Sequence, residues 1–141
     1  MRWSGFRSLA LVVLVAAALA GCASNTVTAP TEPVLTTETF TGSLGPAGSS
    51  LYYFVAKSGQ VTVTLDSLSP DTTMKFTMSI GVYNAYYGCG TPVTGSNTMG
   101  VNSQLIGLAS ATTSLCIAIS DSSGVIPTGA TETFVIKAVH Y

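Results

Sequence analysis

From residue 39 onward, apolar and small polar residues alternate along most of the chain, and clusters of Gly, Pro, Asn and Ser interrupt the alternation. A period of two residues places successive side chains on opposite faces, which is typical of strands buried on one face. Val61, Val63 and Leu65, for example, share one face and are separated by threonines. The pattern predicts seven strands, over residues 39–44, 51–57, 60–66, 73–83, 104–109, 113–120 and 132–141.

No segment beyond the N-terminal region carries a helical period, so the strands must bury their apolar faces against one another. Seven to eight short strands in about 100 residues predict an all-β fold, an antiparallel β-sandwich of two packed sheets. The short Gly-containing turn 57–60 predicts a hairpin between the second and third strands. In the fourth strand, one inward face is predicted for Met74, Phe76, Met78, Ile80 and Val82. Residues 84–102 read as a long insertion-like segment.

The N-terminal segment has the parts of an export signal. Arg2 and Arg7 precede an unbroken apolar run over residues 9–20, and small residues follow it. Twelve residues at ~1.5 Å each cannot cross a hydrocarbon core of ~30 Å, so this run is not a stable membrane span. Residues 1–21 are therefore predicted to be a signal peptide that is removed.

The string Leu19-Ala20-Gly21-Cys22 resembles the lipobox of bacterial lipoproteins. The resemblance implies that the Cys22 thiol receives a diacylglyceryl group, that Cys22 becomes the first mature residue, and that acyl chains, palmitate among them, hold the protein on a membrane. Ala23, rather than Asp, follows the lipid-bearing cysteine, which by the same resemblance favours the outer membrane in a didermal cell. The alternative is an ordinary secretory signal that happens to contain a cysteine.

Composition narrows the classes of partner. The chain is 47% hydrophobic and only 8% charged, which excludes intrinsic disorder, and five basic residues with a formal net charge of −1 exclude a nucleic-acid-binding stripe. Removing Arg2 and Arg7 leaves three lysines against six carboxylates, a net charge near −3. Residues 22–38 are rich in Pro, Ser and Thr and are predicted to form an extended tether to a single domain over 39–141.

Cys89 and Cys116 are predicted to form a disulfide, because export places them in an oxidising compartment and Cys22 is used for lipid. Leu115 and Ile117 flank Cys116 and are predicted to face the core, so Cys116 should face outward and pin the 84–102 segment to the outside of one sheet. Two free redox-active thiols are the alternative, and the chain contains no C-x-x-C motif that would favour it.

Several segments resemble the bacterial pre-peptidase C-terminal (PPC) domain. FTGSL at 40–44, SLYYFV at 50–55 and GQVTVTL at 59–65 resemble its opening strands, and residues 115–121 and 133–137 resemble its last two. The resemblance covers residues 38–141 and implies a jelly-roll-like β-sandwich without catalysis of its own. Some members are implicated in substrate adhesion or calcium binding. This chain has no protease domain, so an adhesion role is not inherited automatically.

The chain offers little material for catalysis or metal binding. His140 is the only histidine, no Ser lies in a G-x-S-x-G elbow, and His140 is expected to be an exposed or edge-strand residue rather than a general base. One His and two paired Cys fall short of a zinc site. Asp66, Asp71 and Asp121 could supply a few calcium ligands, but turns account for Asp71 and Asp121. We expect no enzyme activity, no cofactor and no metal.

Tyr83, Tyr86 and Tyr87 lie within five positions, just beyond a predicted strand. Tyrosine adds apolar contact area at low entropic cost and has a polar tip, so these rings could bind a polymer or protein partner. Alternatively, they could cover an open end of the sandwich near the disulfide. Two functions remain: a non-catalytic envelope lipoprotein that binds a partner, or a purely structural envelope component without a ligand site.

Overall fold

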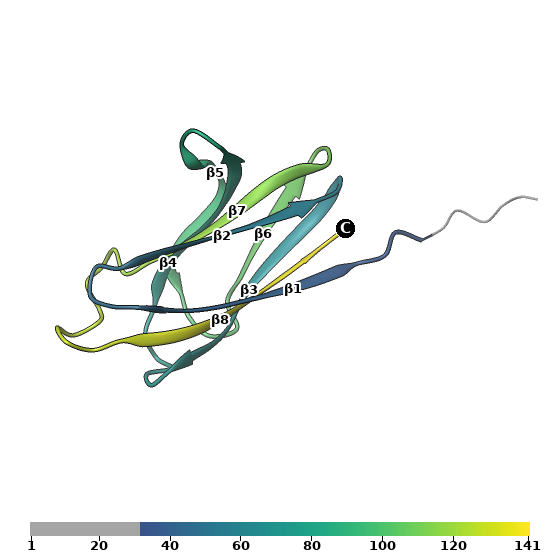
Figure 1. The fold of residues 1–141 in the computed structure, drawn as a ribbon. Helices are drawn as coiled ribbons and strands as arrows, with labels where there is room; N and C mark the ends of the chain where they lie inside the picture. Colours follow the sequence, from purple (N-terminus) through teal and green to yellow (C-terminus); the bar gives the residue numbers. More distant parts are fainter. Residues whose placement is uncertain (1–31) are drawn as a thin grey trace, which may run out of the picture. The chain divides into compact units, whose positions relative to one another are not determined.

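A computed structural model describes residues 32–141 as eight strands in two four-stranded antiparallel sheets (Figure 1). The first sheet has the order β1 (Thr36–Leu44), β8 (Glu132–His140), β3 (Gly59–Ser69) and β6 (Gln104–Ala109). The second has the order β2 (Ser49–Ala56), β7 (Thr113–Ser120), β4 (Phe76–Asn84) and β5 (Gly88–Met99). The predicted signal peptide, Cys22 and the tether up to residue 31 lie outside the described residues.

The strand order is that of a jelly roll, in which the chain passes repeatedly from one sheet to the other and only β4 and β5 are consecutive neighbours within a sheet. The prediction of an all-β antiparallel sandwich is confirmed. Over residues 32–141, no helix long and apolar enough to span a membrane occurs.

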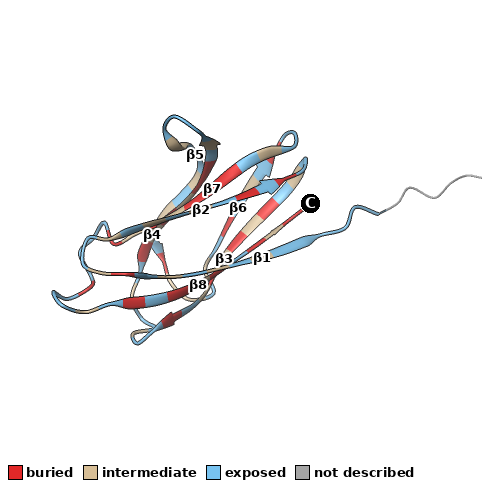
Figure 2. Cartoon of the chain, viewed as in Figure 1, coloured by how far each residue is buried: buried red, intermediate tan, exposed pale blue. Residues whose placement is uncertain are grey.

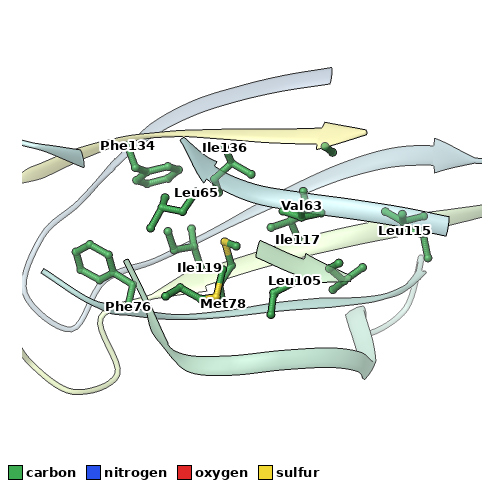
Figure 3. Packing of buried hydrophobic residues seen from close by; sticks show 14 of the residues in the cluster. Val63, Leu65, Phe76, Met78, Leu105, Leu115, Ile117, Ile119, Phe134 and Ile136 are labelled. Carbon is green, nitrogen blue, oxygen red and sulfur yellow. The ribbon is translucent and has the colours of Figure 1, made fainter. Parts of the chain in front are cut away.

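The core lies between the sheets and is built by the predicted alternation. Val61, Val63 and Leu65 are at most 1% exposed, and they pack with Ile117 and Ile119 of the opposite sheet in one apolar cluster (Figure 3). Buried positions alternate with intermediate or exposed ones along β3 and β8 (Figure 2). Because period-two burial fixes which face of each strand turns inward, the remaining side chains of both sheets are directed outward.

The predicted hairpin between the second and third strands is wrong. β2 and β3 belong to different sheets: β2 pairs with β7, whereas β3 pairs with β6 and β8. The segment between β2 and β3 contacts Tyr141 instead. The Lys57 N–H donates to the Tyr141 carbonyl at 2.7 Å, and the Tyr141 ring packs against Gly59. Gly59 has a φ of 145°, a conformation that a side chain would disfavour.

The segment over 84–102 is not an insertion, because β5 occupies most of it and pairs with β4. The register between these two strands shifts near Gly81, and Val82, which was predicted to face inward, is 44% exposed. Such irregularities interrupt the simple alternation on which the prediction rested. The first strand begins at Thr36 rather than at residue 39, so the last three residues of the predicted tether pair with β8.

A buried carboxylate holds the loops at one end of the sandwich. The Asp121 side chain accepts hydrogen bonds from the backbone N–H groups of Ala47 (3.1 Å), Val125 (2.7 Å) and Ile126 (3.2 Å). Burial raises the pKa of the Asp121 carboxyl, but the N–H groups of Val125, Ala47 and Ile126 lower it by more, so its pKa lies below the ordinary value. Asp121 is thus a structural residue that joins the β1–β2 turn to the β7–β8 loop.

Candidate functional site

The outer face of the second sheet carries large apolar side chains from its edge strand. Leu51, Tyr53 and Val55 of β2 point outward and are 37%, 48% and 58% exposed, while the intervening Phe54 is buried. The neighbouring strand β7 carries small side chains at the positions opposite these residues; Ala118, for example, lies opposite Leu51. The result is a ridge of apolar side chains beside a lower strip of sheet surface.

This sheet contains no formal charge. None of its four strands, all within the described chain, includes Asp, Glu, Lys, Arg or His. The charged residues of the described chain lie in the other sheet, in loops or before β1: Glu32, Glu38, Lys57, Asp66, Asp71, Lys75, Asp121, Glu132 and Lys137. Within the strands of the described chain, charge is therefore confined to the first sheet.

The loop between β4 and β5 presents two of the predicted tyrosines to solvent. Tyr86 and Tyr87 are 90% and 85% exposed. Asn84 shapes the turn, because its Oδ1 accepts the Tyr86 N–H at 2.8 Å and its carbonyl accepts the Tyr87 N–H at 3.3 Å. The rings of Tyr86 and Tyr87 consequently do not cover the end of the sandwich.

Tyr83 behaves differently from the other two. It is half-buried at the end of β4, and its ring packs on Tyr53 of β2 with a centroid separation of 4.5 Å and an interplanar angle of 59°. A tilted contact at this distance is a favourable aromatic geometry. Tyr53 thereby joins the three predicted tyrosines, and we refer to Tyr53, Tyr83, Tyr86 and Tyr87 as the aromatic surface.

The predicted disulfide between Cys89 and Cys116 is confirmed, with a Cα–Cα distance of 5.6 Å. Cys116 of β7 lies opposite the exposed Tyr53 on one side and opposite Gly81 on the other, so it is on the outer face as predicted. It is nevertheless fully buried, because the start of β5 lies over it. The disulfide attaches the loop between β4 and β5, which carries Tyr86 and Tyr87 and which we call the aromatic loop, to the middle of the sheet.

An open groove lies beside the loop. Its volume is about 360 Å³, and it is lined by Val82, Tyr83, Asn84, Tyr87, Gly90 and Thr91. The lining combines aromatic rings with an amide, a hydroxyl and backbone groups, and contains no ionisable carboxylate or amine. Such a groove can bind an uncharged molecule by ring contact and hydrogen bonds.

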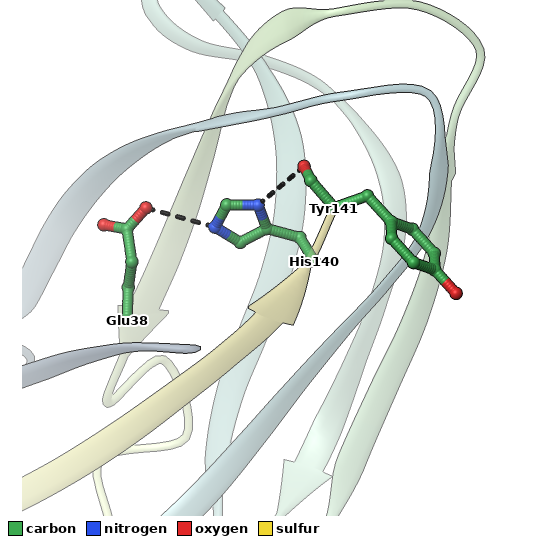
Figure 4. A network of polar contacts seen from close by, with 3 residues as sticks. All are labelled: Glu38, His140 and Tyr141. Atoms are coloured by element: carbon green, nitrogen blue, oxygen red, sulfur yellow. Dashed lines mark hydrogen bonds and ion pairs between the residues drawn. The ribbon is translucent and has the colours of Figure 1, made fainter. Parts of the chain in front are cut away.

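His140 is neither exposed nor on an edge strand, contrary to expectation. Its side chain is 4% exposed on β8, which lies between β1 and β3. Nε2 is 3.1 Å from Glu38 Oε1, and Nδ1 is 3.1 Å from the Tyr141 carbonyl oxygen (Figure 4). The ring also packs against Phe54 at 5.1 Å. These contacts join β1 to β8 and give His140 a structural role.

The three aspartates considered for calcium are separated. Asp66 pairs with Lys137 at 2.9 Å, and Asp71 accepts bonds from the N–H and hydroxyl of Thr73, which lower the pKa of the Asp71 carboxyl. Asp121 bonds to loop N–H groups. Over residues 32–141, no three His, Cys, Asp or Glu side chains gather in a metal-binding arrangement.

Tyr53, with Leu51 and Val55 beside it, was missed as part of the candidate site. The alternation itself contained the signal: if Phe54 faces the core, Tyr53 must face solvent. What the sequence did not show is that β2 and β4 lie in the same sheet on either side of β7, which brings Tyr53 to Tyr83.

Comparison with known protein families gives no match, and no curated protein matches the chain. Two solved structures are similar to the chain. A mitogen derived from Yersinia pseudotuberculosis (YPM) is 12% identical, with 77% of this chain and 88% of that chain covered and a TM-score of 0.52. PliG of Aeromonas hydrophila, a periplasmic inhibitor of g-type lysozyme, is 16% identical, with 74% and 84% covered and a TM-score of 0.48. At such identity, the likeness to the mitogen supports the fold alone.

Proposed function

We propose that the chain is a non-catalytic lipoprotein of the bacterial cell envelope, and that its aromatic surface binds a polymer or protein partner. The observation that carries the proposal is the exposure of Tyr86 and Tyr87, at 90% and 85%, on a loop that a disulfide fixes to an uncharged sheet. Exposed rings that are already held in place lose little conformational entropy when they bind a partner. A fixed loop is therefore better suited to binding than a flexible one.

Lipid attachment at Cys22 is the second part of the proposal. It rests on the resemblance of Leu19-Ala20-Gly21-Cys22 to a lipobox, and on the Pro- and Thr-rich residues that separate Cys22 from β1. The Cys89–Cys116 disulfide fits an oxidising compartment outside the cytoplasm. Ala23 after the lipid-bearing cysteine favours the outer membrane of a didermal cell.

The test is co-sedimentation of the purified chain with insoluble envelope material from the cells that produce it. The Tyr86→Ala/Tyr87→Ala chain should lose retention while keeping its melting temperature, because exposed rings contribute little to the core. Leu108→Ala is the matched control, since Leu108 is 72% exposed on β6 of the opposite sheet. Equal retention of the wild-type and double-variant chains would instead favour a structural envelope component without a ligand site.

A further inference from the structure

The absence of charge on the second sheet restricts the chemistry of a ligand. β2, β7, β4 and β5 contain no ionisable carboxylate, amine, guanidinium or imidazole, so they cannot pair with a charged group on a partner. Moving a ligand charge onto such a face removes its hydration without replacing it. The face therefore favours a ligand that is uncharged over the part that contacts the sheet.

The groove beside the aromatic loop offers two kinds of contact. Tyr83 and Tyr87 contribute ring surface, while Asn84 and Thr91 contribute an amide and a hydroxyl. The bond from the Tyr86 N–H to Asn84 Oδ1 at 2.8 Å orients the amide, so that its NH₂ group is the part left to donate. Ring faces together with neutral donors and acceptors match a molecule that has both C–H faces and hydroxyl edges.

Sugar rings have this combination. A pyranose presents axial C–H groups on its faces and hydroxyls at its periphery, and the groove is open rather than enclosed, so it can accept units in the middle of a chain. We infer that the groove lined by Tyr83, Asn84, Tyr87 and Thr91 binds an uncharged polysaccharide. This inference rests on the proposed function and names the class of its partner.

A protein is the competing partner, since tyrosine is also enriched in protein interfaces. A protein interface, however, normally surrounds its charge-poor core with a polar rim, where complementary charges set orientation and specificity. The second sheet supplies none. The groove is also large enough for one or two sugar rings, which need far less area than a stable protein interface.

Two chemical treatments of the envelope material distinguish these partners. Protease with hot detergent removes proteins and leaves glycosidic bonds, whereas anhydrous trifluoromethanesulfonic acid cleaves glycosidic bonds and leaves peptide bonds. The inference predicts that retention of the wild-type chain survives the first treatment and is lost after the second. It also predicts retention that changes less than about twofold between 0.1 M and 1 M NaCl, where screening lengths fall from ~10 Å to ~3 Å.

A matched pair of substitutions tests the groove itself. Asn84→Asp keeps the oxygen that accepts the Tyr86 N–H but places a carboxylate in the groove, and should weaken retention at least about tenfold. Asn97→Asp adds the same charge to an exposed position of β5 outside the groove lining and should have little effect. Equal weakening by both substitutions would overturn the assignment to the groove.

The outcomes of these experiments distinguish the proposed binding function from the polysaccharide inference. Retention that disappears with protease and survives the acid would overturn the polysaccharide inference and leave the binding function standing with a protein partner. Retention that is unchanged in Tyr86→Ala/Tyr87→Ala, or absent from untreated material, would contradict the binding function itself.

Discussion

Gly81 of β4 lies directly opposite Cys116 of β7, and the disulfide fills the space where a Gly81 side chain would stand. A Cβ at this position would lie 3.1 Å from Cys89 Sγ, 3.1 Å from the Gly90 carbonyl oxygen and 3.4 Å from Cys116 Sγ. The start of β5 therefore lies close against the sheet at a residue without a side chain, and a methyl group there would require its neighbours to move by a few tenths of an ångström. The position of the aromatic loop depends on this contact.

The first prediction follows from that crowding. Gly81→Ala should lower the free energy of unfolding by about 1–3 kcal/mol, because the disulfide and the Gly90 carbonyl must move to accept the methyl group. Urea unfolding measures the change. Gly107→Ala is the control, since the nearest atoms to its new Cβ are 3.7 Å away or more. A Gly81→Ala chain as stable as the wild type would show that the loop is not packed on the sheet as described.

Removing the cross-link should affect both stability and binding. The bond closes a loop with a sequence separation of 27, for which chain entropy gives a stabilisation of roughly 3–4 kcal/mol. Cys89→Ser/Cys116→Ser should lose about this much in urea unfolding. The folded double variant should also be retained less by envelope material, because Tyr86 and Tyr87 would lose their fixed position. Undiminished retention would mean that the disulfide does not organise the binding loop.

Asp121 should make stability depend on acid pH. Its pKa is lowered in the folded chain, so its ionised form contributes stability that is fully present above the unfolded pKa of about 4 and is lost as the pH falls through the folded pKa. Asp121→Asn should be less stable at pH 7 by about 1–3 kcal/mol, since an amide oxygen cannot satisfy all of the backbone N–H groups.

Unfolding curves between pH 7 and pH 2 provide the measurement for this residue. The stability difference between wild type and Asp121→Asn should narrow as the pH falls below about 4. A difference that is constant over the whole range would contradict the assignment of the lowered pKa to Asp121.

The anchoring proposal predicts that Cys22→Ser abolishes lipid attachment, because the resemblance assigns the diacylglyceryl group to the Cys22 thiol. Cells expressing the variant should incorporate no labelled palmitate into the protein, and the chain should leave the detergent phase on partitioning. Cys89→Ser serves as the control, since the proposal gives Cys89 no lipid. Continued palmitate incorporation by Cys22→Ser would contradict the lipobox interpretation.

Local pattern was sufficient to predict seven of the eight strands and the central core residues, but not the way the strands pair. Val61, Val63 and Leu65 are buried as their alternation predicted, because the two-residue period depends only on neighbouring positions. The hairpin at 57–60 was wrong because the pairing of β2 with β7 and of β3 with β8 depends on contacts far apart in sequence. β5 was missed because Pro92 and several glycines interrupt its pattern.

The same limit applies to the candidate site. Tyr83, Tyr86 and Tyr87 stand out by their spacing, and Cys116 was placed on the outer face by its buried neighbours. His140 was misjudged because its position near the C-terminus says nothing about the strand order, which places β8 inside a sheet. The lack of charge on one sheet could be seen only when strands were assigned to sheets.

The proposed binding function requires Tyr86 and Tyr87 to form the contact surface, and tyrosine nitration by tetranitromethane tests this directly. In the free chain both rings should react readily, being 90% and 85% exposed, while the partly buried Tyr52 and Tyr141 react slowly and serve as internal references. When the chain is bound to envelope material, peptide mapping should show that nitration of Tyr86 and Tyr87 falls several-fold and that of the references is unchanged. Equal nitration of Tyr86 and Tyr87 in the bound and free chains would contradict a binding surface at these two residues.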